Sequence, residues 1–421
     1  MQILRVMKQL EPEGLSRCTD YVIRVISPED DMANAWNALL QASHPGLACA
    51  PFMRFQYLAA LHRSGSACPA SGWTPHWLSL WQGHEMMAAA PLYLKTHSYG
   101  EYVFDWAWAN AFEQHGLAYY PKAVVAVPFT PVPGPRLLAR NPAWRRQLVS
   151  ELLAFCKDQG VSSLHVLFAS EEDLAATAQP FEDSSHFTPR HTVQFHWQNV
   201  KPMPAASQAF RFADFEDFLG SLNQEKRKKI RQERRKVTEA GVVFRALRGT
   251  RITTDHWDFF YRCYAQTYLE HGNPPYLTRD FFKQLQEQQA GQWLMFVAYN
   301  ERGEPIAASL VALSDESDSP QAAFGRYWGA LERVECLHFE ACYYQPLQWC
   351  MAHGVQRFEG GAQGEHKMAR ALLPVTTHSA HWLAHPAFAD AVDRFLEREE
   401  TDVLRYLEHL ETRSPFRAGP Q

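Results

Sequence analysis

The order of apolar and polar positions predicts a chain in which helices and strands alternate. In the first half, residues 21–26 alternate like a strand and residues 28–40 carry the apolar face of a helix. Residues 51–53 are expected to open a second helical run, which Gly65 ends. The apolar runs 77–81 and 86–94 flank a Gly-His-Glu turn and predict a hairpin. Further strands are expected at 103–108, 123–132 and 163–168.

The clearest helical pattern begins at Asn141 and ends at Gly160. Asn is a good N-cap, and Pro142 suits the first helical position, because an N–H there would have no intrahelical partner. One face carries the apolar residues Trp144, Leu148, Val149, Leu152, Leu153 and Cys156. We expect this face to be buried.

Three landmarks of the first half recur in the second half in the same order. They are PFM at 51–53 and PYL at 275–277, EMMAAAPLYL at 85–94 and EPIAASLVAL at 304–313, and QGV at 159–161 and HGV at 353–355. Recurrence in one order predicts a duplicated α/β domain. The alternative is that a common succession of helix, hairpin, helix and strand recurs by chance.

The stretch 324–370 carries most of the candidate chemistry. An apolar run ends at Gly329, a loop follows, and an amphipathic helix ends near Gly354, with Pro346 expected to kink it or to mark its start. A short strand at 355–358 then leads into a glycine-rich polar turn. Enzymes of the α/β class present ligands at strand ends in this way.

Polar segments and one basic segment complete the second half. Residues 170–187 are interpreted as a linker, and 192–197 as the first strand of a second domain. Residues 214–241 predict one helix, in which 226–236 hold eight Lys or Arg against one acid. This run is either the solvated face of a surface helix or a platform for phosphates.

An amphipathic helix beyond Pro386 is expected to dock on the second domain.

Composition adds the class of protein. With 421 residues, 46% hydrophobic and 21% charged, the chain is globular and long enough for two cores. A net charge of −5 argues against a general polyanion binder but leaves room for one basic patch. Eight cysteines without a C-x-x-C pair indicate reduced thiols. Residues 1–20 are interpreted as a polar leader, no 18-residue apolar run occurs, and we expect a cytoplasmic protein.

Five segments of the chain together resemble one known family, the FemAB-like proteins. The segments are LYLKTHSYGEYVFDWAWA (92–109), KRKKIRQERRKV (226–237), GRYWG (325–329), LHFEACYYQ (337–345) and FEGGAQGEHKMAR (358–370). Members of this family are tandem GNAT-fold acyltransferases, often labelled as peptidoglycan biosynthesis or recognition proteins. The resemblance covers residues 21–416.

The resemblance implies a fold and a reaction. The fold is α/β with mixed sheets, in two tandem GNAT-like (acyl-CoA N-acyltransferase) domains related by duplication. We expect a leader at 1–20, domain 1 at 21–185, domain 2 at 186–385 with its basic helix, and a C-terminal helix and tail at 386–421. The reaction is transfer of an acyl group from acetyl-CoA or aminoacyl-tRNA to the amine of a small molecule or peptide, including a cell-wall precursor. The long helical arm of some aminoacyl-tRNA users is not evident, which leaves tRNA contact to the basic run 226–236.

Acyl transfer to an amine needs a base for the ammonium, donors for the oxyanion and an acid for the leaving group. Glu365, His366 and Lys367 are the first catalytic candidates, because titratable neighbours in one turn shift one another's pKa. Tyr327 and Glu340 are further catalytic candidates. An aromatic residue in a strand such as Tyr327 is equally interpreted as core.

Binding candidates come from both halves. Trp328, His338, Arg231 and Arg235 are candidates for contact with the donor. The residues Lys95, Tyr99, Glu101 and Asp105 make a polar break in an apolar neighbourhood of the first half. They either line a groove for the acceptor or satisfy a β-turn.

The expected donor loop, 330–338, departs from the GNAT pattern. In GNAT folds, a splayed strand offers backbone N–H groups to the donor and the next helix N-terminus holds its pyrophosphate. Here the loop has no glycine, and Glu332 and Glu335 would repel phosphate. Two alternatives to an enzyme follow. One is a non-enzymatic peptidoglycan or peptide binder with a degenerate donor site, and the other is an RNA-contacting protein that uses Arg231, Arg234 and Arg235.

No metal is expected. The three histidines His378, His381 and His385 lie close together in the sequence, but no carboxylate or cysteine nearby completes a ligand set.

Overall fold

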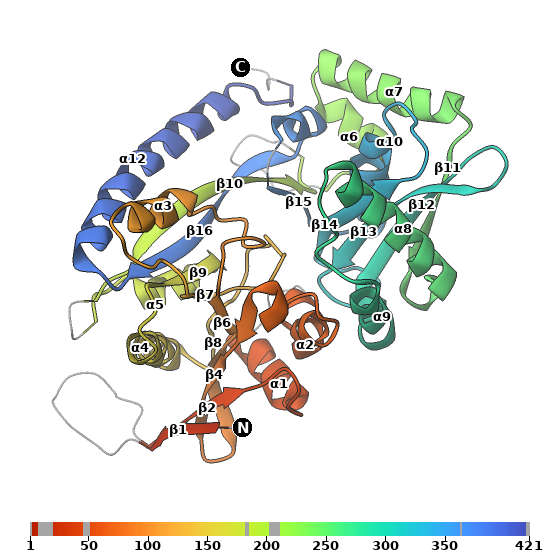
Figure 1. The fold of residues 1–421 in the computed structure, drawn as a ribbon. Coiled ribbons are helices and arrows are strands. Elements are labelled where there is room, and N and C mark those ends of the chain that lie inside the picture. Colours follow the sequence, from red (N-terminus) through yellow and green to blue (C-terminus); the bar gives the residue numbers. More distant parts are fainter. Residues whose placement is uncertain are drawn as a thin grey trace. The chain divides into compact units, whose positions relative to one another are not determined.

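The computed structural model describes residues 2–6, 20–44, 51–181, 185–201, 211–362 and 364–417. These residues form two compact units (Figure 1). Unit 1 is Met1–Thr192 with Thr377–Leu404, and unit 2 is Val193–Thr376 with Arg405–Gln421. The chain passes between the units inside strand β10, strand β16 and helix α12, whose bounds are given below.

Unit 1 is built on short strands with helices between them. Its strands are β1 (Gln2–Val6), β2 (Val22–Ile26), β3 (Trp73–Pro75), β4 (Trp77–Gln82), β5 (Glu85–Ala90), β6 (Leu92–Lys95), β7 (Lys122–Val125), β8 (Leu138–Ala139), β9 (Ser163–Ala169) and part of β16 (Leu373–Leu383). Its helices are α1 (Ala33–Ser43), α2 (Phe55–Arg63), α3 (Trp106–Gln114), α4 (Pro142–Asp158), α5 (Glu171–Thr177) and most of α12 (Pro386–Glu411). Short 3-10 turns are η1 (Pro51–Met53) and η2 (Pro69–Ser71). The strand orders are β1-β2-β4-β5-β8 and β16-β9-β7-β6-β3, and β7 and β9 run parallel.

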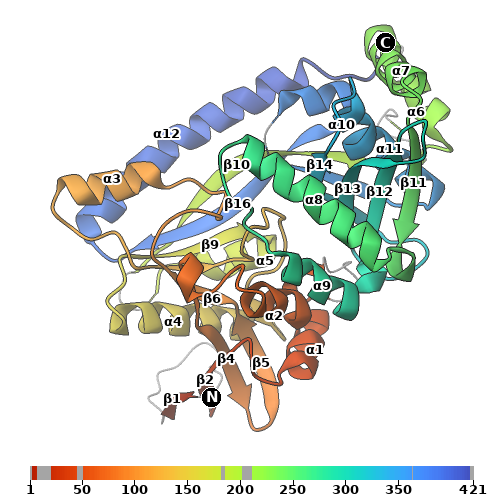
Figure 2. The ribbon, with the colours of Figure 1, turned by 45° about the vertical axis from the view of Figure 1, so that its right-hand side comes forward.

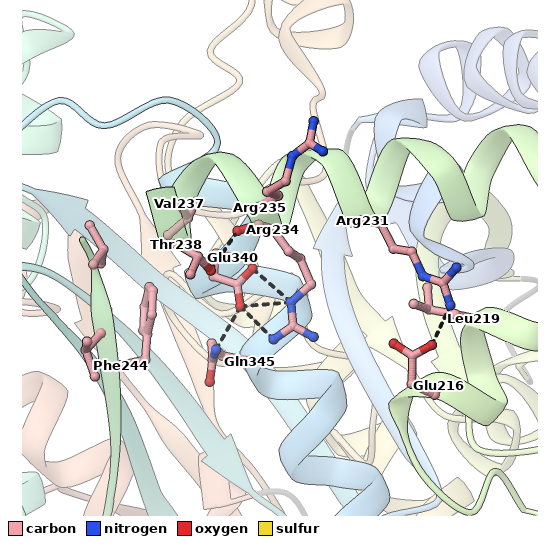
Figure 3. A pocket seen from close by; sticks show the side chains of 12 residues that line it. Glu216, Leu219, Arg231, Arg234, Arg235, Val237, Thr238, Phe244, Glu340 and Gln345 are labelled. Atoms are coloured by element: carbon pink, nitrogen blue, oxygen red, sulfur yellow. Dashed lines mark hydrogen bonds and ion pairs between the residues drawn. The ribbon is translucent and has the colours of Figure 1, made fainter. Parts of the chain in front are cut away.

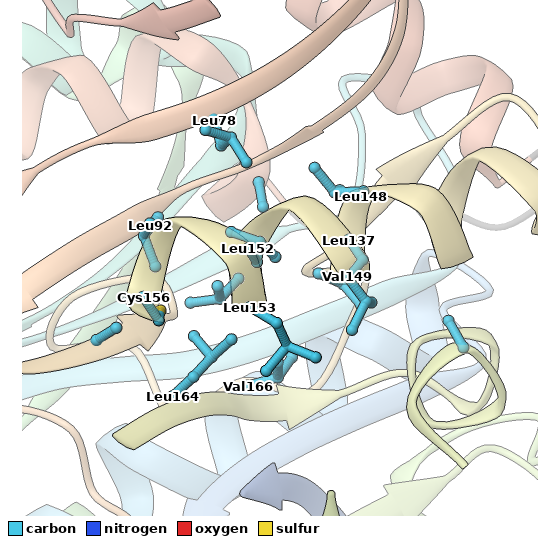
Figure 4. Close-up of a cluster of buried hydrophobic side chains, with 14 of the residues drawn as sticks. Leu78, Leu92, Leu137, Leu148, Val149, Leu152, Leu153, Cys156, Leu164 and Val166 are labelled. Carbon is cyan, nitrogen blue, oxygen red and sulfur yellow. The ribbon is translucent and has the colours of Figure 1, made fainter. Parts of the chain in front are cut away.

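Helix α4 organises the core of unit 1. The Asn141 side chain accepts a hydrogen bond from the Trp144 N–H at 3.0 Å, and Pro142 is the first helical residue. The apolar face packs on strand residues such as Leu78 and Leu164 (Figure 4). The helix predicted at 141–160 is therefore confirmed, and its buried face joins the two groups of strands into one core.

Unit 2 has one sheet with helices on both faces (Figure 2). Its strands are β10 (Thr188–Gln198), β11 (Val243–Arg248), β12 (Trp293–Tyr299), β13 (Pro305–Leu313), β14 (Ala322–Ala330) and β15 (Arg357–Ala362). Its α-helices are α6 (Phe215–Ser221), α7 (Gln224–Glu239), α8 (Thr254–Glu270), α9 (Arg279–Gln288), α10 (Leu337–Phe339) and α11 (Gln345–Ala352). The remaining turns are the 3-10 helices η3 (Gly249–Arg251), η4 (Ala290–Gln292) and η6 (Glu365–Arg370) and the π-helical turn η5 (Glu340–Tyr344). The strand order is β11-β12-β13-β14-β15-β10, and β14 and β15 are the parallel pair.

The sequence of β12 explains why both faces are covered. Phe296 lies in one apolar cluster with Leu347 of α11. Trp293 instead packs against Trp257 of α8, with 6.5 Å between ring centroids. Alternate residues of a strand point to opposite faces, so a continuous apolar run such as WLMFVAY is buried on both.

The same order of elements occurs in both units. Apart from the short strand β3, the succession β2, α1, α2, β4, β5 in unit 1 recurs as β11, α8, α9, β12, β13 in unit 2. In each unit a later helix then leads into a strand with a parallel neighbour, α4 into β9 beside β7 and α11 into β15 beside β14. The predicted repeat of element order is confirmed.

Several predicted strands differ from the structure. The strand predicted at 103–108 is wrong, because Trp106 begins α3, whose Trp108 and Phe112 are buried one helical turn apart. The strand predicted at 123–132 ends at Val125, since the prolines that follow cannot donate to a ladder. Residues 2–6 of the expected leader form β1 and pair with β2, whereas 7–19 lie outside the described residues. The strand predicted at 355–358 begins two residues later, as β15.

Three predictions about helices also need correction. The linker predicted at 170–187 contains α5, which Ser170 caps by accepting from the Asp173 N–H. The single helix predicted at 214–241 is two helices, because Asn223 caps α7 and accepts from the Lys226 N–H at 3.0 Å. Helix α12 was expected to dock on the second domain. Its residues up to Leu404 belong instead to unit 1, where Phe388 packs on Phe112, so the prediction is wrong for this part of the helix.

The chain is helical from Leu337 to Ala352, and the helix has one wider, π-helical turn in its middle. The N–H of Gln345 donates to the carbonyl of Glu340, five residues back, which is the π-helical pattern. Pro346 follows this wide turn directly and stands in the first turn of α11, where a residue without an N–H is tolerated. Within the described part of the chain, no helix combines the length and the apolar character needed to cross a membrane.

Candidate active site

The sheet of unit 2 opens between its two parallel strands. The ladder of β14 and β15 has three pairs and ends at Phe324 and Glu359, although β14 runs on to Ala330. Arg326 is the extra residue of a β-bulge, because its neighbours Gly325 and Tyr327 pair with consecutive residues of β13. A bulge bends its strand and leaves backbone groups unpaired. The end of the ladder and the bulge together mark the place where the two strands separate.

Glu359 stands at the last pair before this opening. Its side chain is buried, and Arg357 Nε donates to Oε1 at 2.9 Å. Among the described residues, the second oxygen, Oε2, has no hydrogen-bond partner. Burial raises the pKa of Glu359 to about 7, although the nearby Arg357 and Arg326 oppose the shift. A carboxyl group with this pKa accepts a proton readily at neutral pH.

Two histidines and two aromatic residues cluster near the start of the helical segment. His338 packs edge-on against Trp328, with 5.4 Å between centroids, and against Tyr343 at 5.7 Å. Tyr343 Oη lies 3.3 Å from His366 Nε2. Burial lowers the pKa of both histidines, that of His338 to about 4. Both imidazoles are therefore neutral at pH 7 and can donate or accept a hydrogen bond.

The predicted Glu-His-Lys turn is the 3-10 helix η6, and its three side chains diverge. Glu365 is exposed and bonds to Arg413 Nη1 at 2.5 Å and to Tyr406 Oη at 3.2 Å. His366 is also exposed, and its ring lies beside Tyr343. Lys367 is buried and donates to the Gly361 carbonyl at 3.1 Å, and burial lowers its pKa to about 8. The structure therefore does not bring the three groups into one catalytic contact.

A buried ion pair holds this turn in place. Arg370 Nη2 donates to Glu233 Oε2 at 2.7 Å, and Arg370 Nη1 donates to the His366 carbonyl at 2.7 Å. The guanidinium lies 3.6 Å from the centroid of Phe339, and Glu233 also accepts from Tyr344. The sequence analysis missed this pair. The only signal was that Glu233 is the single acid in the basic run, at a helical position shared with apolar neighbours.

Tyr327 and Glu340 lie in different surroundings. Tyr327 packs edge-on against Tyr264 of α8 and Phe282 of α9, with centroids 5.5 and 5.8 Å away. Glu340 is buried and accepts from Arg234 Nη2 at 3.0 Å and from Gln345 Nε2 at 2.7 Å. The ion pair with Arg234 thus balances the negative charge of the Glu340 carboxylate.

Arg231 and Arg235 of α7, with Arg234, line a separate pocket of about 520 Å³ (Figure 3). Arg231 pairs with Glu216 at 2.5 Å, and Arg235 pairs with Glu239 at 3.5 Å, all four side chains being exposed. The pocket lies against β11, and two strands, β12 and β13, separate β11 from β14. Arg231 and Arg235 are therefore not grouped with Trp328 and His338, the other predicted donor contacts.

The predicted acceptor residues of unit 1 surround a lysine that the sequence analysis missed. Lys122 is buried; its Nζ donates to Glu101 Oε2 at 2.8 Å and also bonds Asp105. Burial raises the pKa of Glu101 to about 7. Burial acts to raise the pKa of Asp105, but the charges of Lys122 and His165 and the hydrogen bonds from Lys122 and Ser98 together lower it to about 2. Lys95 is buried over the Trp73 ring, its pKa lowered to about 7, and donates to the carbonyl of Tyr99, whose own side chain is exposed.

The described residues hold no group of three or more His, Cys, Asp or Glu that could bind a metal ion. Two of the three histidines noted in the sequence instead pair with other histidines. His381 Nδ1 lies 2.7 Å from His165 Nδ1, and His378 Nδ1 lies 2.8 Å from His191 Nδ1.

Comparisons with known proteins agree with this architecture. The model of the FemAB-like family, described as peptidoglycan biosynthesis/recognition, matches residues 29–418. The crystal structure of FemX matches with 9% identity and a TM-score of 0.50, covering 88% of this chain and 99% of that chain. At this identity the likeness shows the fold, and the predicted fold class, a mixed α/β chain of two tandem GNAT-like domains, is confirmed.

Two more solved structures are similar at a lower level. L-PGS from Bacillus licheniformis matches with 12% identity and a TM-score of 0.48, covering 86% of this chain and 96% of that chain. A tandem GNAT protein from the clavulanic acid biosynthesis pathway matches with 14% identity and a TM-score of 0.43, covering 87% and 99%. No curated protein sequence matches this chain.

Proposed function

This chain belongs to the FemAB-like family, and from that premise we propose that it is an N-acyltransferase whose reaction takes place where β14 and β15 separate. The acyl group is acetyl or aminoacyl, and the acceptor is the amine of a cell-wall precursor peptide. The observation that carries the proposal is Glu359. It combines burial, a pKa of about 7 and an oxygen that has no hydrogen-bond partner among the residues the structure describes, at the end of a parallel ladder.

The proposed chemistry follows from the demands of amide formation. Glu359 takes a proton from the acceptor ammonium, and the free amine attacks the donor carbonyl carbon. A C–N bond forms, the bond from that carbon to the donor's sulfur or oxygen breaks, and the leaving group takes up a proton. The main chain of β14 beyond Phe324, where the ladder with β15 has ended, is proposed to donate to the oxyanion. Trp328, His338, His366 and Lys367 are proposed to contact the donor from the helical side.

The donor is proposed to be acetyl-CoA or aminoacyl-tRNA, both of which carry phosphate. The loop 330–338, which carries Glu332 and Glu335, repels phosphate less strongly than its sequence alone indicates. Glu335 pairs with Lys236, and Glu332 Oε1 lies 3.4 Å from Asn300 Nδ2. Neutralisation of one of the two acids supports a phosphate-bearing donor near this loop.

A second candidate is a peptide-binding protein without catalysis. The absence of glycine between residues 330 and 338 favours it, because close approach of a donor to the backbone usually needs glycine. The burial of Glu359 at the end of the ladder, which raises its pKa to about 7, favours the enzyme.

The test is a transfer assay with the full-length chain. Labelled acetyl-CoA and labelled aminoacyl-tRNA are offered in turn with a precursor peptide that carries a free amine, and label on the peptide is measured. We expect transfer from one donor, reduced at least a hundredfold in Glu359→Gln. The matched control is Glu304→Gln, which alters an exposed carboxylate beside Arg302 and should leave the rate unchanged. Saturable binding of the peptide without transfer from either donor would replace the enzyme by the binding protein.

A further inference from the structure

The pocket beside α7 is separate from the opening of the sheet. It is bounded by α7, the edge strand β11, the π-helical turn and α6, and its volume is about 520 Å³. β11 is the outermost strand of the unit 2 sheet, with two strands between it and β14. A volume of this size is in the range of small-molecule pockets. The proposed acyl transfer uses none of its lining residues.

One arginine in this pocket is held rigidly. Arg234 reaches from α7 to the buried Glu340, and its Nε and Nη2 bond to that carboxylate at 3.0 to 3.2 Å (Figure 3). Nη2 also donates to Gln348 Oε1 at 2.9 Å. In the part of the chain that the structure describes, no hydrogen bond is recorded for Arg234 Nη1. A fixed guanidinium with an unused edge is preorganised to donate to an anion.

A second arginine is free to change partners. Arg231 lies one turn before Arg234 and bonds the exposed Glu216, with side-chain exposures of 57% and 68%. Exposed ion pairs contribute little to stability, so a ligand of higher charge can replace Glu216 at small cost. Arg231 and Arg234 therefore offer two guanidinium groups on one helix face, and arginine binds phosphate oxygens in a bidentate manner.

Apolar residues also line the pocket. They are Leu219, Val237, Val242, Val243 and Phe244, of which the first three are buried and only Val243 and Phe244 are accessible to solvent. Val243 is 63% exposed, which is unusual for a valine in a strand. A small inorganic anion would leave Val243 and Phe244 in contact with water, whereas a ligand with an apolar or aromatic part would cover them.

We propose that this pocket binds a phosphate monoester that carries an apolar or aromatic body. The phosphate binds Arg231 and Arg234, and the body packs on Val243 and Phe244. Two kinds of molecule combine a phosphate monoester with such a body: a nucleoside monophosphate and a short-chain phosphatidic acid. The site goes beyond the proposed acyl transfer, because it lies beside the edge strand β11, whereas the proposed reaction takes place between β14 and β15, and because its occupation requires no reaction.

Isothermal titration calorimetry of the full-length chain tests the proposal. The ligands are adenosine 5′-phosphate and dihexanoyl phosphatidic acid, with inorganic phosphate as the reference for the headgroup alone. We expect at least one of the two to bind about tenfold more tightly than inorganic phosphate, and the tighter one identifies the source. Equal affinity of both ligands and inorganic phosphate would overturn the proposal.

Variants locate the site without any assay of activity. Arg231→Gln should weaken binding about tenfold, since a charge-assisted hydrogen bond is lost. Thr238→Trp should weaken it by filling the pocket, because Thr238 lines the pocket from the exposed face of α7. Lys228→Gln is the matched control, because it removes one exposed charge of the same helix outside the pocket. If Lys228→Gln weakens binding as much as Arg231→Gln, attraction to the basic helix alone explains the result and the pocket is rejected.

Discussion

Glu359 lies opposite His196 in the antiparallel pairing of β15 with β10, and Glu359 Oε2 is 3.8 Å from His196 Nε2. These groups do not form an ion pair at neutral pH. Burial lowers the pKa of His196 to about 3, so its ring is neutral, and burial raises the pKa of Glu359 to about 7. The site therefore holds a carboxyl group that changes its charge near neutrality next to a ring that does not.

This relationship predicts a change in stability with pH. A glutamate with a pKa of about 7 in the folded chain and 4.5 in the unfolded chain stabilises the fold fully below pH 4.5. That contribution falls as the pH rises to about 7, by roughly 3 kcal/mol, since each pKa unit corresponds to about 1.4 kcal/mol. Glu359→Gln should match the wild type below pH 4.5 and be more stable above pH 7. Urea unfolding at both ends of this range measures the difference, and a constant offset would contradict the raised pKa.

Lys122 should be essential for the stability of unit 1. Lys122→Met leaves Glu101 and Asp105 buried without a counter-charge, and breaking a buried ion pair from one side costs about 3–5 kcal/mol. The matched control is Lys283→Met, whose ion pair with Glu287 is exposed, and it should unfold like the wild type. Thermal unfolding compares the two.

The second step of that experiment restores charge balance. Adding Glu101→Gln and Asp105→Asn to Lys122→Met should recover part of the lost stability, because no buried charge then remains unpaired. No recovery would show that Lys122 acts through packing and not through its charge.

Gly329 should tolerate no side chain. A Cβ atom at this position of β14 would lie 2.0 Å from the carbonyl oxygen of Cys263 in α8. Gly329→Ala should therefore destabilise unit 2 by about 3 kcal/mol through overpacking. Gly220→Ala is the control, because nothing lies within 4 Å of its Cβ and alanine favours the helix α6. Equal urea midpoints for the two variants would contradict the close contact of α8 with β14.

Glu365 and His366 should differ in the transfer assay. The carboxylate of Glu365 is exposed and bonds Arg413, which lowers its pKa, so Glu365→Gln should keep most of the activity. His366 lies beside Tyr343 in the proposed donor contact, and His366→Asn should lower the rate about a hundredfold. The opposite ranking would return the catalytic role to Glu365. The melting temperatures of both variants check that the fold is intact.

Periodicity predicted the elements whose burial pattern is regular. Helix α4 carries its cap and its apolar face in adjacent residues, so its start, end and buried face were visible in the sequence. Strand β10 was placed correctly in its apolar part but extends four residues before the predicted start. Helix α3 was missed because two tryptophans in a short segment are equally typical of a strand, and contacts with α12 decide between them.

The candidate site was predicted only in part, because its chemistry depends on distant segments. Glu359 lies in a stretch that the sequence analysis selected, but its raised pKa comes from burial beside β10, far away in the chain. Lys122 meets Asp105 across a loop and a helix, which no local pattern records. Three neighbours in a 3-10 helix point in directions about 120° apart, so Glu365, His366 and Lys367 could not converge.

The dependence of kcat/KM on pH tests the central claim most directly. If Glu359 is the general base, kcat/KM of the wild type should rise with pH to a plateau with a midpoint near 7, because the carboxylate must be ionised to accept the proton. Glu359→Gln should be at least a hundredfold slower and lose this midpoint. A Glu359→Gln variant that keeps both the wild-type rate and the same midpoint would contradict the assignment of Glu359.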